Sequence, residues 1–331
     1  MAENVQYTPS PELRRAVLFE YGEKVGGAWM YSLPTVVSNM CTMWGLTIVG
    51  VPDSGALSCT VFVRDRGGRD MVLKIPVFPY LSEQETFTVK KFADRGLSPQ
   101  VTHRDPLTGA FTIDRVFPGT SVEPVTGQDV ENMIHVMEVL SCGTVPPFST
   151  QPPLPRVTDR VQMRYTWAVD RFRQTGNEAG GSLLHMVEDL LPYPGCVTSR
   201  DVMLHGDLQP KNILRGGENT PVMLIDPLGC VGPVETDIAL WITLQEGDFS
   251  CVSLIERFGN LVWVNREELA RWVTIFTILE LRPYQEKYRE RMVTFLHSDV
   301  ASGVLCAPTL GELVDQAISV TTDPRPVVDG A

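Results

Sequence analysis

Residues Met203 to Leu214 read MLHGDLQPKNIL, and a second apolar run, VMLID, follows at 222–226. The apolar part of each run has the composition of a short strand, and polar residues follow it directly. The loop after the first run carries an aspartate and an asparagine five residues apart, Asp207 and Asn212, and the second run ends on Asp226. The two strand–loop units therefore carry three side chains that offer oxygen atoms.

These side chains suit phosphoryl transfer. That reaction needs the acceptor hydroxyl oriented, a metal ion placed and the phosphate charge neutralised, with little covalent help from the protein. The carboxylate of Asp207 can accept the hydroxyl proton, while Asn212 and Asp226 offer the hard oxygen ligands that Mg²⁺ prefers. Taken singly, Asp207 is also a good turn former, Asn212 a good cap and Asp226 an ordinary acid at the end of a strand. All three in this order favour a Mg²⁺-dependent phosphotransferase.

Hydrophobic periodicity and turn residues outline the rest of the chain. The expected strands are 46–51, 58–64, 70–76, 100–103 and 110–116. The expected helices are 11–46, 83–95, 129–142, 157–174, 181–191, 254–258, 266–281 and 283–297. Strands thus dominate the first part of the chain and helices the rest, with a hinge expected at 117–119.

The motif His205-x-Asp207-x₄-Asn212, with an apolar-Asp pair ending at Asp226, resembles the catalytic and metal-binding loops of the aminoglycoside phosphotransferases, relatives of protein kinases. The resemblance implies an α+β, bilobal protein-kinase-like fold. Residues 1–117 would form a small β-rich N-terminal lobe with a leading helix and a nucleotide-binding sheet. Residues 118–331 would form a larger helical lobe with the catalytic loop, the metal loop and the acceptor pocket.

The same resemblance assigns roles and cofactors. It implies ATP and Mg²⁺, with Asp207 as the catalytic base, Asn212 and Asp226 as metal ligands, and a small-molecule acceptor that carries a hydroxyl. His205 is chiefly structural in this pattern. Asp237 resembles a family acid that supports the catalytic loop through hydrogen bonds.

Lys74 lies toward the end of the strand MVLKIP at 71–76 and matches the lysine with which these kinases hold the α- and β-phosphates. Glu85 looks like the helix glutamate that pairs with this lysine. Glu83, two residues earlier, is a rival for the same role. A lysine near the end of a strand commonly just faces solvent. The role assigned to Lys74 therefore depends on its position in the pattern.

The phosphate-covering loop departs from the kinase pattern, because no GxGxxG stands between the first two strands. Residues 52–58 occupy this position instead, and Ser54 and Ser58 are candidate donors to the β- and γ-phosphates. An ordinary loop between strands accounts for each serine equally well. Val116, beside the hinge, is expected to line the ATP cleft.

Within the family, the likeness is to the streptomycin 6-phosphotransferase or hydroxyurea-resistance branch. It rests on Ala28-Trp29 in the first helix, on residues 114–119 (DRVFPG) and on Ile225-Asp226-Pro227 in place of a DFG-like triplet. The resemblance covers about 26–241 and fades in the last 90 residues, where these enzymes build much of the acceptor pocket. It therefore predicts the reaction better than the acceptor.

The acceptor is expected to be a polar, cationic, aminoglycoside-like antibiotic, which implies a role in antibiotic resistance. The chain has a net charge of −12, and its C-terminal part carries acids that suit a cation or, alternatively, a solvated helix face: Glu280, Glu286, Glu290 and Asp299. Two rival functions stay open. One is a biosynthetic or metabolic kinase of the same fold, and the other is a catalytically silent nucleotide-binding relative.

Composition excludes several classes of protein. Of the 331 residues, 43% are apolar and 21% charged, which is typical of a globular chain. The acidic balance argues against a nucleic-acid binder. Residues 1–15 lack the features of a signal peptide, and no apolar run is long enough for a membrane helix. The seven scattered cysteines indicate reduced thiols in a cytoplasm, and a monomer and a homodimer are both compatible with the sequence.

Overall fold

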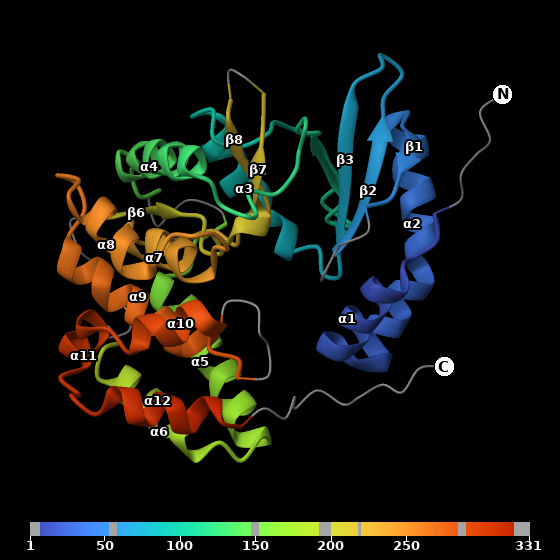
Figure 1. The fold of residues 1–331 in the computed structure, drawn as a ribbon. Coiled ribbons are helices and arrows are strands. Elements are labelled where there is room, and N and C mark those ends of the chain that lie inside the picture. The colour runs from blue at the N-terminus through green and yellow to red at the C-terminus, as the bar shows by residue number, and fades with distance from the viewer. Residues whose placement is uncertain are drawn as a thin grey trace. The chain divides into compact units, whose positions relative to one another are not determined.

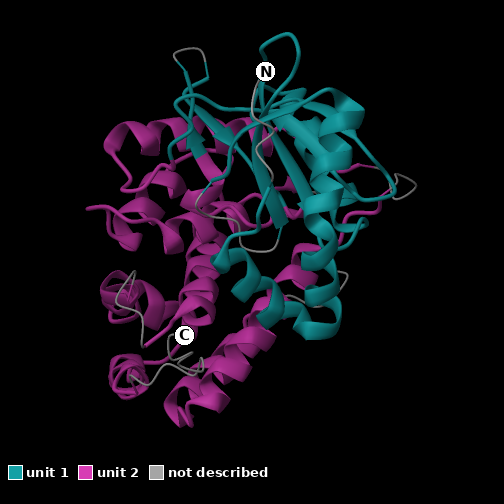
Figure 2. Cartoon of the chain, turned by 90° about the vertical axis from the view of Figure 1, so that its right-hand side faces the viewer, with its two compact units in different colours: residues 1–120, 214–227 teal, residues 121–213, 228–331 magenta. Residues whose placement is uncertain are grey.

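The structure is a computed structural model and describes residues 7–52, 58–146, 152–191, 200–217, 220–283 and 289–320 (Figure 1). The chain forms two units, which are coloured separately in Figure 2. Unit 1 contains residues 1–120 and 214–227, and unit 2 contains residues 121–213 and 228–331. Asp226 therefore belongs to unit 1, whereas Asp207 and Asn212 belong to unit 2.

Unit 1 begins with helices α1 (Pro11–Gly22) and α2 (Ala28–Trp44), separated by a π-helical segment, η1 (Glu23–Gly27). The side chain of Ser10 caps α1 by accepting a hydrogen bond from the third residue of the helix. Gly45 ends α2 with φ of 65°, a left-handed conformation that glycine adopts without a steric penalty. The sequence predicts one continuous helix over 11–46. It does not predict the π-helical segment that separates α1 from α2.

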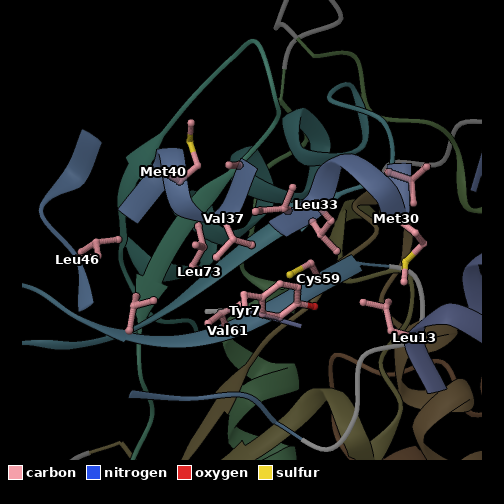
Figure 3. Close-up of a cluster of buried hydrophobic side chains, with 14 of the residues drawn as sticks. Tyr7, Leu13, Met30, Leu33, Val37, Met40, Leu46, Cys59, Val61 and Leu73 are labelled. Carbon is pink, nitrogen blue, oxygen red and sulfur yellow. The ribbon is translucent and has the colours of Figure 1, made fainter. Parts of the chain in front are cut away.

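The sheet of unit 1 is antiparallel and five-stranded, in the order β1-β2-β3-β5-β4. Its strands are β1 (Thr47–Gly50), β2 (Ser58–Arg64), β3 (Asp70–Pro76), β4 (Val101–Arg104) and β5 (Phe111–Asp114). Alternate residues of β2 are buried, as the period of a strand with one covered face requires. On that face Val61 and Leu73 share a core with Leu33 and Val37 of α2 (Figure 3).

Helix α3 (Leu81–Ala93) follows β3 in unit 1. Strand β8 (Val222–Leu224) joins the unit from much later in the chain and pairs with β7 (Ile213–Arg215). Leu224 explains this placement, because its N–H donates to the carbonyl oxygen of Leu97 at 2.8 Å and its carbonyl accepts a hydrogen bond from Ser98. Asp226 follows two residues after the end of β8 and therefore also belongs to unit 1.

Unit 2 is mainly helical. Its helices are α4 (Gly127–Ser141), α5 (Val157–Gln174), α6 (Glu178–Glu188), α7 (Glu235–Leu244), α8 (Cys251–Gly259), α9 (Arg266–Glu280), α10 (Arg289–Leu296), α11 (Asp299–Leu305) and α12 (Leu310–Ile318). A two-stranded sheet joins β6 (Asp201–Leu204) to β9 (Cys230–Pro233), and a 3₁₀ turn, η2, spans Pro210–Asn212. Every residue of α7 is buried, so this helix lacks the amphipathic period that identifies a surface helix in a sequence.

The division into a strand-rich part and a helical part confirms the predicted α+β class. In the part of the chain that the structure describes, no helix combines the length and the apolar character that crossing a membrane requires.

Candidate active site

Lys74 is the centre of the candidate nucleotide site in unit 1. It lies on β3, between β2 and β5, opposite Thr60 and Phe111, and only 4% of its surface is exposed. Its ammonium group donates to the carboxylate of Glu85 and, at 2.7 Å, to Oδ1 of Asp226. Burial lowers the pKa of Lys74, but the charges of Asp226 and Glu85 outweigh burial and raise it, so the lysine stays charged.

The structure separates the two candidate glutamates of α3. Glu85 contacts Lys74, whereas Glu83 pairs at 3.1 Å with Arg104 of β4. Two residues along a helix correspond to a rotation of about 200°, so the two side chains leave α3 in nearly opposite directions. The side chain of Glu85 is 18% exposed and that of Glu83 is 50% exposed, which leaves Glu85 as the partner of Lys74.

Asp226 supplies the second carboxylate of this site. Its backbone is left-handed, with φ of 57°, a conformation that aspartate tolerates better than most residues other than glycine. Its side chain is 44% exposed although one oxygen contacts the buried Lys74. Lys74, Glu85 and Asp226 thus come together in unit 1 from β3, α3 and the segment after β8.

The other predicted nucleotide-binding residues take no part in these ion pairs. Ser54 lies outside the described residues. Ser58 starts β2 opposite Pro76 and is partly buried, and Val116 is partly buried in the segment after β5. Their roles remain predictions.

The candidate catalytic loop of unit 2 follows β6 and is held by Asp237 of α7. The carboxylate of Asp237 accepts the backbone N–H of His205 at 2.6 Å and that of Gly206 at 3.0 Å, which confirms the predicted support of the loop. Gly206 has φ of 77°, and a β-carbon there would lie 3.0 Å from Sγ of Cys230, so the position requires glycine. Burial raises the pKa of Asp237 to about 7, against the lowering effect of the two backbone donors.

Asp207 and Asn212 lie together in this loop. The amide nitrogen of Asn212 donates to the carbonyl oxygen of Asp207 at 2.8 Å and to its Oδ2 at 3.0 Å. Nε2 of Gln209 donates to both carboxylate oxygens of Asp207, at 2.9 and 2.8 Å. Because the amide nitrogen of Asn212 is turned toward Asp207, the amide oxygen is the atom left to bind a metal.

Sequence reasoning missed Arg164 of α5. Its Nη2 lies 2.5 Å from Oδ1 of Asp207, and its Nη1 donates to the carboxylate of Glu280 at the end of α9. Burial raises the pKa of Asp207, but the charge of Arg164 and the hydrogen bond from Gln209 outweigh it and lower the pKa. One signal was available in the sequence, because Arg164 interrupts the buried stripe that α5 forms with Val157, Val161, Ala168 and Phe172.

The acids expected near the acceptor prove to differ in their surroundings. Glu280 is a correction, since it is neither solvated nor free: its side chain is 7% exposed and lies against Arg164 and Arg282. Glu290 and Asp299 lie in the first turns of α10 and α11, where an acid stabilises the helix dipole. Glu286 lies outside the described residues.

Both predicted metal ligands offer oxygen atoms of the kind that Mg²⁺ prefers. An amide oxygen on Asn212 and an exposed carboxylate on Asp226 are hard ligands, and Mg²⁺ is usually held by one or two protein ligands together with phosphate oxygens and water. Across the described ranges, no group of three or more histidine, cysteine, aspartate or glutamate side chains is placed to bind a metal. Magnesium binding by Asn212 and Asp226 stays a prediction.

No family model matches the sequence, and a search of curated proteins finds no match. Solved structures do match. A choline kinase from Cryptosporidium parvum Iowa II has a TM-score of 0.55 at 13% identity, covering 86% of this chain and 98% of that chain. A macrolide 2′-phosphotransferase from Brachybacterium faecium has a TM-score of 0.51 at 15% identity, covering 80% and 97%.

A thermostable mutant of the aminoglycoside phosphotransferase APH(4)-Ia, in ternary complex with ADP and hygromycin B, is also similar. Its TM-score is 0.51 at 12% identity, and the match covers 85% of this chain and 98% of that chain. At these identities the likeness concerns the fold. The chain has the protein-kinase-like fold of these small-molecule phosphotransferases, which confirms the fold predicted from the sequence. The streptomycin branch remains a prediction.

Proposed function

We propose that the protein is a Mg²⁺-dependent kinase that transfers the γ-phosphoryl group of ATP to a hydroxyl of a small molecule. The observation that carries the proposal is the catalytic loop of unit 2, which holds the carboxylate of Asp207 and the amide of Asn212 together. The buried pair of Lys74 and Glu85 supports it independently. Similar structures in complex with AMP and with ADP and hygromycin B also support nucleotide and hydroxyl-acceptor binding.

In the proposed reaction the acceptor oxygen forms a bond to the γ-phosphorus as the bond from that phosphorus to the β,γ-bridging oxygen breaks. ADP leaves with the electron pair of the broken bond, and the hydroxyl proton passes to the carboxylate of Asp207. Lys74, kept charged by two carboxylates, neutralises phosphate charge. Asn212 and Asp226 would hold Mg²⁺, which supplies further charge neutralisation when it is bound.

For the acceptor, we infer a polar, hydroxyl-bearing antibiotic of the aminoglycoside kind, and hence a role in resistance. The net charge of −12 supports a cationic acceptor. Glu280 gives no such support, because arginine side chains already contact its carboxylate. A biosynthetic kinase of the same fold would show the same active-site chemistry with another acceptor.

The test is phosphate incorporation from ATP in the presence of Mg²⁺, with a panel of aminoglycosides, macrolides, choline and amino sugars. We expect Asp207→Ala to lower turnover by about 10²- to 10⁴-fold, the usual contribution of a general base, while ATP affinity measured by calorimetry stays within about twofold. Asp170→Ala is the matched control, since Asp170 is a half-exposed aspartate of α5.

The outcomes separate the candidate functions. Turnover of Asp207→Ala near the wild-type rate would remove Asp207 from its role. A wild-type protein that binds ATP but phosphorylates nothing in the panel, and does not hydrolyse ATP, would favour the catalytically silent relative.

A further inference from the structure

Asp207 is held from two sides that differ in kind. Gln209 and Asn212 contact its carboxylate from within the same loop. Arg164 reaches the carboxylate from α5, an 18-residue helix packed into unit 2. The contact from α5 therefore ties the carboxylate to a rigid element of the fold.

Glu280 fixes the arginine in turn. The guanidinium group is planar, and its two terminal nitrogens diverge at a fixed angle. With Nη1 on the carboxylate of Glu280, the direction of Nη2 toward Asp207 is set. Arg164 thus links the end of α9 to the carboxylate of Asp207.

We propose that Arg164, anchored by Glu280, is a positioning residue that fixes the carboxylate of Asp207 for the transfer step. The inference rests on the proposed kinase function and deepens it. Arg164 acts through Asp207 and has no assigned contact with a substrate.

Energetics favour a functional reason for this network. The side chains of Arg164, Glu280 and Asp207 are only 9%, 7% and 18% exposed. Removing each charge from water is energetically costly, and well-packed apolar residues commonly stabilise a fold as well as a buried ion network does. Stability alone therefore does not require an arginine in the apolar stripe of α5. Orienting the carboxylate of Asp207 gives a reason for an arginine at this position.

The first test is the steady-state kinetics of Arg164→Met and Arg164→Lys, with rates expressed per ATP-binding site counted by calorimetry. We expect kcat of Arg164→Met to fall about 100-fold, a loss that displacing a catalytic group by about 1 Å can cause, with KM for ATP unchanged. Arg164→Lys keeps the charge but loses the planar fork of donors. Its kcat should therefore be about tenfold higher than that of Arg164→Met.

A double-mutant cycle with Glu280→Gln tests the anchor. Glu280→Gln alone should lower kcat about tenfold, because the amide holds Arg164 less firmly. In the Arg164→Met background the same change should have no further effect on kcat, since Glu280 reaches Asp207 through Arg164. Arg164→Met leaves the buried carboxylate of Glu280 with Arg282 as a remaining partner. The double variant removes that buried charge, so it guards against loss of folding.

Arg171→Met is the matched control. Arg171 also extends from α5 to the end of α9, where its Nη1 donates to the carbonyl oxygens of Leu279 and Leu281 at 3.0 Å. A purely structural role for this region predicts that Arg171→Met and Arg164→Met lower stability alike and leave kcat per binding site unchanged. We expect Arg171→Met to lower stability only.

Each outcome decides the inference. A loss of kcat confined to the Arg164 and Glu280 variants, with a non-additive cycle, supports it. Wild-type kcat in Arg164→Met, or additive effects in the cycle, overturn the positioning role and leave the kinase assignment standing. A wild-type protein that phosphorylates no acceptor overturns both.

Discussion

Replacing Glu85 with alanine removes one of the two carboxylates that neutralise the buried ammonium of Lys74. Removal of one partner from a fully buried ion pair commonly destabilises a protein by about 3–5 kcal/mol. Two features reduce this figure: the side chain of Glu85 is 18% exposed, and Asp226 still lies 2.7 Å from the ammonium. We therefore expect Glu85→Ala to lower the free energy of unfolding by about 2–3 kcal/mol.

Glu83→Ala is the matched control on the same helix. Its partner is Arg104, and the two side chains are 50% and 31% exposed. Surface pairs of this kind contribute about 0–1 kcal/mol, so the control should cost less than about 1 kcal/mol. The contrast between the variants depends only on which glutamate faces β3.

The assay is urea unfolding followed by circular dichroism, with the midpoint and the slope both measured so that stability is separated from a change in the unfolded state. Calorimetric titration with ATP provides a second measurement, because Glu85→Ala should also weaken binding while Glu83→Ala should not. Equal losses in the two variants, or a larger loss for Glu83→Ala, would refute the assignment of Glu85 as the partner of Lys74.

Three further expectations concern a metal ligand, a buried acid and a helix end. Asp226→Asn should abolish most of the gain in ATP affinity that Mg²⁺ provides, as measured by titrations with and without the metal, since the charged ligand is lost. Burial raises the pKa of Asp237 from 3.8 to about 7, so its contribution to stability is fully present below pH 4 and is lost as the pH rises through 7. Between pH 4 and 7 the unfolding free energy of the wild type should therefore fall more steeply than that of Asp237→Asn, by up to about 1.4 kcal/mol per pH unit, and equal slopes would count against the raised pKa. Gly45→Ala should destabilise the protein by about 1–2 kcal/mol through its left-handed φ of 65°. Gly127→Ala, in the first turn of α4 with open space around its α-carbon, should be neutral or stabilising in the same unfolding assay.

The sequence alone determined the features that depend on near neighbours. The strands over 58–64 and 70–76 and the helix over 157–174 were predictable because period-2 and period-3.6 patterns reflect burial on one face. The chemistry of Asp207 and Asn212 was predictable because both belong to one short loop whose spacing is visible in the chain.

Only the tertiary structure decided which distant side chains meet. Arg164 contacts Asp207 across 43 residues of sequence and Glu280 across 116, and Lys74 contacts Asp226 across 152. Helix α7 escaped prediction because it is buried on all sides and has no polar face to reveal its period. These features depend on how helices and strands pack against one another. Packing brings together residues that are far apart in the sequence, so the pattern of neighbouring residues does not predict these contacts.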